Sequence, residues 1–224
     1  VGDGKGADAL KPFWKRLRCS GAKVDAVAID MSPAYIQAVT NHLPRAAIVF
    51  DHFHVIKLFN EKLSDLRREL HREATGPLQK QVLKGTRWLL LKNPENLDQT
   101  RREPKRLREA LKLNDSLAAA YYLKEDLREL WNQPSKACAA AHLDLWIHEA
   151  EWSGVRILMQ FAKTLAAHRT GILAWYDHPI STGPLEGTNH KIKTMKRQAY
   201  GFRDLEFFKL KILALHTTKY ALVG

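Results

Sequence analysis

Cysteine is scarce in this 224-residue sequence: only Cys19 and Cys138 occur, and they lie far apart. Two isolated cysteines give neither a disulfide framework nor the paired spacing of a zinc site. Long apolar runs are also missing, and the first residues show neither an apolar signal core nor an initiator methionine. The sequence therefore argues against a disulfide-rich secreted domain and against a membrane protein, and it predicts a reducing, cytoplasmic setting.

Acidic residues are few relative to basic ones. The chain has 24 aspartates and glutamates against 36 lysines and arginines, which gives a formal net charge of +12. Such an excess favours polyanionic partners, chiefly nucleic acid. A generic basic protein remains the alternative, because net charge alone does not prove binding.

Two short apolar runs in the first quarter of the chain each end on an aspartate, Asp30 and Asp51. Between them, Ser32 and Pro33 indicate a helix start, because a hydroxyl can cap the first turn and proline fits within it. Pro44 marks the end of that helix. The pattern predicts two parallel strands joined by a crossover helix, and continuous apolar runs are typical of strands buried on both faces.

The same pattern places Asp30 and Asp51 at the carboxyl ends of their strands. This is the edge at which open α/β sheets bind ligands, so either carboxylate could belong to a functional site. The alternative is structural, since aspartates also end strands and cap helices through local hydrogen bonds.

A helical region follows the second strand. From residue 55 the apolar residues recur at helical spacing, and a long helix is expected to continue to Gly76-Pro77. Four further helices are predicted at residues 78–91, 103–111, 117–131 and 137–169, and Gly154 could interrupt the last one. Basic residues and tryptophans in this region could bind nucleic acid through phosphate contacts and base stacking. A helical bundle with its tryptophans in the core is the favoured interpretation.

Helix-start signals return at residues 181–184, with Glu186 in the first turn, where the helix dipole favours an ionised carboxylate. The face that begins with Glu186 continues with His190, Lys193 and Arg197. It could hold a metal ion at its start and phosphates along its length. An exposed helix with a weak Glu186–His190 pair is the alternative. A final amphipathic helix is predicted at residues 205–220.

The order of these elements is that of a known family. The chain resembles the DDE transposases of bacterial insertion sequences, specifically the ISL-three-type group. The resemblance is carried by Ala-Ile-Asp30-Met-Ser-x-x-Tyr35, by Leu43-Pro44-x-Ala46-x-Ile48-Val49-x-Asp51-x-Phe53-His54-Val55, and by Gly183-x-Leu185-Glu186-Gly187-x-Asn189-x-Lys191-Ile192-Lys193-x-x-Lys196-Arg197-x-Ala199-x-Gly201-Phe202. These motifs lie near both ends of the chain, and the middle fits in being helical.

The resemblance implies roles for individual residues. Asp30 is similar to the family's second catalytic aspartate and Glu186 to its catalytic glutamate, and both would bind metal. Asp51 and His54 match a motif near the site. The residues expected to contact DNA are His190, Lys191, Lys193, Lys196 and Arg197. The implied cofactor is Mg²⁺, two ions per site, for which Mn²⁺ can substitute.

The resemblance also implies an α/β fold, namely a partial ribonuclease-H-like core without its first strands and with a large all-helical insertion. Residues 1–75 and 179–224 would belong to the core, and residues 76–178 would form the insertion. The expected function is that of a transposase that cleaves and transfers DNA strands of an insertion sequence. Its partners would be transposon ends and target DNA, bound by a homo-oligomer at the nucleoid.

One residue of the family pattern has no match. The family's first catalytic aspartate lies on an earlier strand, and no acidic residue before Asp30 fits it. The chain is therefore expected to be a carboxyl-terminal part of a transposase and to be inactive alone. The alternatives are a DNA-binding or assembly fragment without chemistry, a ribonuclease-H-like nuclease that cleaves without joining, and a basic helical scaffold.

Overall fold

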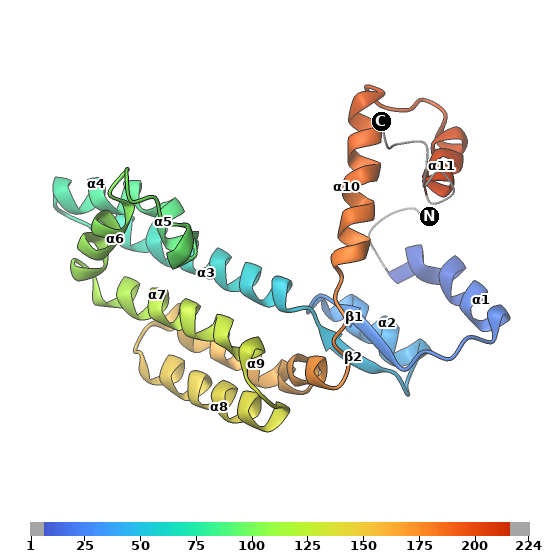
Figure 1. Ribbon diagram of the computed structural model, residues 1–224, viewed down its shortest axis with the longest axis horizontal. Helices are drawn as coiled ribbons and strands as arrows, with labels where there is room; N and C mark the ends of the chain where they lie inside the picture. Colours follow the sequence, from blue (N-terminus) through green and yellow to red (C-terminus); the bar gives the residue numbers. More distant parts are fainter. Residues whose placement is uncertain (1–6, 216–224) are drawn as a thin grey trace. The chain divides into compact units, whose positions relative to one another are not determined.

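The computed structural model describes residues 7–215 and divides into two compact units (Figure 1). One unit comprises Val24–Ile180, and the other comprises Val1–Lys23 with Ser181–Gly224. Among residues 7–215, no helix has both the length and the apolar character that a membrane span needs.

The larger unit contains the predicted strand–helix–strand element. Strands β1 (Ala26–Ile29) and β2 (Ala47–Phe50) pair in parallel, with Ile29 opposite Phe50. Helix α2 (Pro33–His42) connects them, so the predicted crossover and its boundaries are confirmed. The carboxyl ends of both strands consequently lie at one edge of the sheet.

Two details of this element differ from the prediction. The Ser32 hydroxyl makes no capping hydrogen bond to α2, although Ser32 stands at the cap position. Every residue of β1 is half-buried, whereas Val49 and Phe50 of β2 are buried. Within residues 7–215 the sheet has two strands, so β1 has β2 as its one strand neighbour. The expectation that both strands are buried on both faces is therefore wrong for β1.

Helices make up the rest of the larger unit. After α3 (His52–Glu73) come α4 (Pro77–Gly85), α5 (Arg87–Leu91), α6 (Glu103–Lys112), α7 (Asp115–Arg128), α8 (Lys136–Trp152) and α9 (Arg156–Leu173), with short 3₁₀ turns at Pro94–Asn96, Glu129–Asn132 and Ala174–Tyr176. Figure 1 shows α3 running from the sheet into this helical region, with α7 and α9 packed along it and α8 packed against α9. No strand interrupts residues 78–178, as predicted.

Two predicted helices are each broken in two, the second at Gly154, where the sequence had indicated a possible interruption. The helix predicted at 78–91 divides at Thr86, whose hydroxyl donates to the Leu83 carbonyl oxygen at 3.0 Å. The helix predicted at 137–169 divides at Gly154, which has a left-handed φ of 68°. Next to it, Ser153 donates to the carbonyl of Ala150 at 2.7 Å. Both hydroxyls satisfy a carbonyl that the helix leaves open at its end.

The core of the larger unit lies between α3, α7, α8 and α9. Phe59, Trp146 and Phe161 are fully buried and meet edge to face, with ring centroids 5.0 to 5.9 Å apart. Such aromatic contacts add about 0.5–1.5 kcal/mol per pair to the apolar burial. The Trp146 Nε1–H donates to the Leu123 carbonyl at 2.7 Å, so its polar atom is satisfied inside the core.

The other tryptophans of this region correct the sequence interpretation. Trp146 is a core residue as expected, but Trp88 is 66% exposed and Trp152 is 79% exposed. Trp88 packs instead under the Arg87 guanidinium, whose central carbon lies 4.7 Å from the ring centroid. The preference for core tryptophans is therefore wrong for these two positions.

The smaller unit contains α1 (Lys11–Ser20), α10 (Gly183–Gln198) and α11 (Leu205–Ala214). Trp14 of α1 is buried, whereas no residue of α10 or α11, both described in full, is buried. Between α10 and α11, Phe202 stacks on Phe208 with ring centroids 4.6 Å apart. The predicted continuation of the last helix to residue 220 lies outside the described residues.

Candidate functional site

Asp30 lies directly after β1, at the predicted edge of the sheet. Its Oδ1 accepts a hydrogen bond from the Ser32 backbone N–H at 3.1 Å, and the residue is half-buried. Among residues 7–215, no other hydrogen bond or ion pair to this side chain is present. The turn therefore holds the carboxylate at the strand end and leaves it able to accept a cation.

Asp51 occupies the neighbouring position on β2. Its backbone N–H donates to the Ile29 carbonyl at 3.2 Å, which continues the strand pairing to the level of Asp30. The Asp51 side chain is 2% exposed, and its Oδ1 accepts from the Phe53 N–H at 2.8 Å. Asp51 is thus the buried amino-terminal cap of α3, which gives its carboxylate a structural role.

His54 lies in the first turn of α3, with its Nδ1 3.9 Å from Asp51 Oδ1. Asp30, Asp51 and His54 therefore belong to one edge of the sheet in the larger unit. Asp30 and Asp51 each follow the carboxyl end of their strand, as the sequence predicts, and a chemical role for Asp51 or His54 stays a prediction.

Glu186 lies in the first turn of α10, as predicted. The Nδ1 of His190 lies 2.9 Å from the Glu186 backbone carbonyl oxygen, so this ring contacts the helix backbone. Lysine and arginine occupy the last turn, where cations interact favourably with the helix dipole. Both ends of α10 thus carry charges that suit its dipole.

The cationic residues of α10 gather on one surface. A groove of about 780 Å³ is lined by His190, Lys193, Lys196, Arg197, Tyr200 and Gly201. Four of the five residues predicted to contact DNA therefore share one groove. Lys191, the fifth, lines a separate, mostly apolar groove of about 850 Å³ between α10 and α11, which His190 also borders.

Tyr200 is a feature of this surface that sequence reasoning missed. Its side chain is fully exposed, and its backbone has a left-handed φ of 50°, an uncommon conformation for a bulky residue. The sequence reads Tyr200-Gly201, which indicates a helix end. Its place in the sequence, as an aromatic residue directly after a basic helix, was the signal that could have identified it as part of a binding surface.

Asp30 and Glu186 lie in different units, Asp30 in the larger and Glu186 in the smaller. Their predicted convergence on a shared metal site stays a prediction. Within residues 7–215, no three histidine, cysteine, aspartate or glutamate side chains form a group that could hold a metal ion.

Comparison with known proteins gives a consistent result across most of the chain. A family model described as a transposase, of the ISL3 type of DDE enzymes, matches residues 1–212. The transposase for insertion sequence element IS1001 of Bordetella parapertussis is 38% identical over 220 residues, which cover 96% of this chain and 53% of that protein. The transposase for IS1557 of Mycobacterium tuberculosis is 31% identical over 205 residues, 82% of this chain and 46% of that protein.

The chain spans about half the length of these two curated relatives. A third match, to a Lactococcus lactis protein named ATP-dependent protease, is 43% identical but covers 60 residues, or 27% of the chain. A match this short carries no functional argument. No solved structure matches the chain.

Proposed function

The chain belongs to the ISL3-type family of DDE transposases, and from this membership we propose that it acts in metal-dependent cleavage and strand transfer of an insertion sequence. The observation that carries the proposal is that the family match spans residues 1–212, which include the motifs of both Asp30 and Glu186. The substrates would be the transposon ends and the target DNA.

Asp30 and Glu186 are the residues that would hold Mg²⁺, two ions per site, with Mn²⁺ as a substitute. Carboxylate oxygens suit Mg²⁺, and Asp30 offers one at a strand end, held in place by a backbone N–H. When bound, the metal ions would supply Lewis-acid activation of the attacking oxygen and would neutralise charge on the leaving oxygen. The protein's own contribution is to fix these carboxylates and to position the phosphate.

The α10 groove would position that phosphate. His190, Lys193, Lys196 and Arg197 line one groove and could contact several DNA phosphates at once. Lys191 would contact DNA from the neighbouring face of the same helix. These contacts carry no sequence information, so recognition of the terminal repeats would depend on other residues.

For the fold, the proposal is a ribonuclease-H-like core built from residues 1–75 and 179–224, with residues 76–178 as a helical insertion. The parallel pair of β1 and β2 and the helices that follow support this arrangement. The transposase would act as a homo-oligomer on DNA in the cytoplasm, at the nucleoid.

A third carboxylate is required by this mechanism, and no acidic residue before Asp30 matches the family's first aspartate. The 224-residue chain alone is therefore expected to bind duplex DNA without cleaving it in Mg²⁺. Nicking by the isolated chain that depends on Asp30 would contradict this expectation.

The catalytic assignment is tested in an active transposase that contains this chain. Asp30→Asn and Glu186→Gln should each reduce Mg²⁺-dependent cleavage of a labelled transposon-end duplex by at least about a thousandfold, while DNA binding persists. Matched controls are Asp25→Asn, an exposed residue before β1, and Glu206→Gln, in the first turn of α11. Both controls should cleave normally.

The outcomes separate the rival functions. Retained cleavage by either Asp30→Asn or Glu186→Gln would reject the assignment of that residue. Cleavage without joining in a strand-transfer assay would favour a ribonuclease-H-like nuclease. DNA binding without cleavage in any longer protein that contains this chain would favour a DNA-binding or assembly role.

A further inference from the structure

A second basic groove lies in the larger unit, between α3 and α5. Its volume is about 330 Å³, and the residues that matter here are Phe53, Lys57, Asn60, Arg68 and Arg87. We call it the α3–α5 groove. The two helices pack against each other. The groove thus joins the helix that follows Asp51 to the region predicted as an insertion.

The helical period explains how this groove forms on α3. Phe53, Lys57, Asn60 and Arg68 recur at spacings of four, three and eight residues, which places them along one side of the helix. The buried side carries Val55, Phe59, Leu63 and Leu66. The burial of α3 in the core therefore holds the basic side in a fixed orientation toward α5.

Positive charge is crowded at the α5 end of the groove. The Arg67 Nη1 donates to the Leu83 carbonyl at 3.0 Å, and burial together with the guanidiniums of Arg87 and Arg68 lowers the pKa of Arg67. The buried Arg67 Nε has no hydrogen-bond partner within residues 7–215. Arg68 and Arg87 line the groove, whereas Arg67 lies outside its lining, and an anion bound in the groove would offset part of the repulsion among these charges.

Nearby carboxylates do not balance these cations. Asp65 pairs with Arg68 at 2.6 Å, but both side chains are exposed, and such a pair contributes little. Glu61 lines the groove as well, together with Lys57, Arg68 and Arg87. The groove wall therefore has three cations against one carboxylate, together with the side chain of Asn60, whose Oδ1 is buried without a partner in the described part of the chain.

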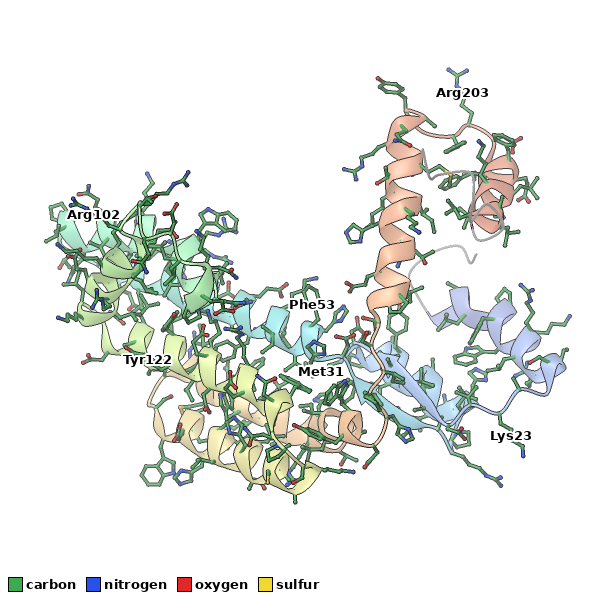
Figure 2. All side chains as sticks on the ribbon, in the orientation of Figure 1. Lys23, Met31, Phe53, Arg102, Tyr122 and Arg203 are labelled. Carbon is green, nitrogen blue, oxygen red and sulfur yellow. The ribbon has the colours of Figure 1, made fainter. Side chains whose placement is uncertain are left out.

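The length of the α3–α5 groove and its position beside the sheet edge indicate which ligand it binds. Lys57 and Arg68 are eleven residues apart, or about 16 Å along the helix, which matches about five base pairs of duplex DNA. Phe53, 56% exposed, lies two residues after Asp51, at the end of the groove next to the sheet edge that carries Asp30 (Figure 2). Cations spread over this length, two on α3 and one on α5, fit a phosphate backbone better than a single small anion.

We propose that the α3–α5 groove binds the sugar–phosphate backbone of duplex DNA and extends the DNA path from the Asp30 edge into the helical region. The proposal rests on the proposed function, since it takes DNA as the substrate, and it adds a binding surface to that function. Lys57, Arg68 and Arg87 contact phosphates, and Phe53 lies against the DNA near the sheet edge.

The first test removes the charges and measures DNA binding by the 224-residue chain. The triple variant Lys57→Gln, Arg68→Gln, Arg87→Gln is compared with Arg101→Gln, Arg108→Gln, Lys112→Gln. The control triple also removes two arginines and one lysine from exposed positions. Each triple includes one arginine that pairs with an aspartate three residues before it, Arg68 with Asp65 and Arg101 with Asp98.

The probe is a fluorescent 30-base-pair duplex of arbitrary sequence, titrated at several salt concentrations. The groove triple should bind at least about tenfold more weakly at 0.1 M salt, and the slope of log K against log salt should fall by about two to three units. The control triple should change both values little. Equal losses in both triples, or no loss in the groove triple, would overturn the proposal.

A second measurement does not depend on removing charge. A photo-crosslinking benzoylphenylalanine replaces Phe53 in one variant and Tyr122 in another. Both aromatic side chains are exposed, Phe53 on α3 and Tyr122 on α7, and both are labelled in Figure 2. Crosslinking to the duplex is expected from position 53 and not from position 122. The reverse result, or equal yields, would contradict the assigned surface.

Inorganic phosphate distinguishes a polynucleotide site from a site for a single anion. At constant ionic strength, replacing chloride with phosphate should not displace the duplex beyond the effect of salt. Specific displacement at low phosphate would mean a small-anion pocket and would reject the DNA path. All three measurements report binding, so failure of cleavage in the catalytic tests leaves them unaffected, and a positive binding result does not require activity.

Discussion

Asp30 and Asp51 end neighbouring strands, but their carboxylates are differently engaged. Asp51 is buried and caps α3 through the Phe53 N–H, whereas Asp30 is half-buried and accepts one backbone hydrogen bond. Both residues belong to motifs that carry the family resemblance, which gives Asp30 a catalytic role and Asp51 a place near the site. The hydrogen bonds add a physical reason for this difference, because a buried cap explains Asp51 without any chemistry.

This difference predicts how Asp51 variants behave. Asp51→Ala should lower the free energy of unfolding of the 224-residue chain by about 1–2 kcal/mol, because the α3 cap is lost. Asp51→Asn should keep stability within about 0.5 kcal/mol, since asparagine caps helices as well as aspartate. Urea unfolding followed by circular dichroism measures both changes.

The same pair of variants tests the role of Asp51 in an active transposase. Asp51→Asn should retain cleavage, in contrast to Asp30→Asn. A stable Asp51→Asn variant that has lost cleavage would show that the charge of Asp51 takes part in the chemistry, and the structural explanation would then be insufficient.

At the scale of elements, the sequence predicted what local spacing determines. The order of β1, α2 and β2, the start of α3 after Asp51 and its end before Pro77 all follow from apolar period and proline positions. The division between α4 and α5 was missed because it depends on the Thr86 hydroxyl turning back to the Leu83 carbonyl. A threonine inside an apolar helical pattern does not by itself indicate that hydrogen bond.

Gly171 shows a second kind of missed feature, one that depends on a distant partner. It lies in α9 where this helix packs on β2, and a Cβ there would fall 2.5 Å from the Phe50 ring and 3.2 Å from the Ile48 carbonyl oxygen. Gly171 lies two residues beyond the predicted end of this helix at residue 169, whereas α9 continues to Leu173. A glycine fits this position because α9 approaches β2 closely, and this packing positions β2 and hence Asp51.

Gly171→Ala is therefore expected to destabilise the chain by about 1–3 kcal/mol, through forced displacement of Phe50. The usual gain of about 1 kcal/mol for alanine over glycine in a helix acts in the opposite direction and is included in that range. Chemical denaturation of the purified chain gives the value.

A double-mutant cycle identifies the cause of this loss. In a Phe50→Val background the ring that meets the new Cβ is absent, so Gly171→Ala should cost at least about 1 kcal/mol less. An equal cost in both backgrounds would place the strain elsewhere, for example at the Ile48 carbonyl.

At the scale of the whole molecule, the net charge of +12 and the family motifs can be read from the sequence. The described residues before 24 and after 180, far apart in sequence, fall into one unit. The resemblance also groups the two ends of the chain, in a core that includes residues 24–75 as well, and these domain boundaries stay a prediction. The grouping of distant segments depends on tertiary contacts, which the spacing of apolar residues along the chain does not indicate.

Net charge also governs how stability responds to acid. Several carboxylates of the larger unit have lowered pKa values, including Glu103, which accepts from the Asp98 N–H at 2.8 Å and from Lys92 at 2.6 Å. Because the folded pKa is depressed, Glu103 stabilises the fold above its ordinary value of 4.5, and this contribution is lost as pH falls through the folded value. Protonating carboxylates also raises the positive charge of a chain that is already basic.

The melting temperature should therefore fall as pH is lowered below about 4.5, because the Glu103 contacts are lost and because repulsion between cations increases. Added salt distinguishes these two contributions. Repulsion between distant exposed cations is screened at 0.5 M salt, whereas the short contacts of Glu103, which is buried, are screened much less. Glu103→Gln should lower the melting temperature at pH 7. It should also reduce the fall in melting temperature with acid that persists in high salt. Glu109→Gln, exposed on the same helix, is the matched control, and its melting temperature should depend on pH as that of the parent chain does. If Glu103→Gln retained the full acid response at high salt, the contacts around Glu103 would not be its source, and general repulsion would have to account for the loss.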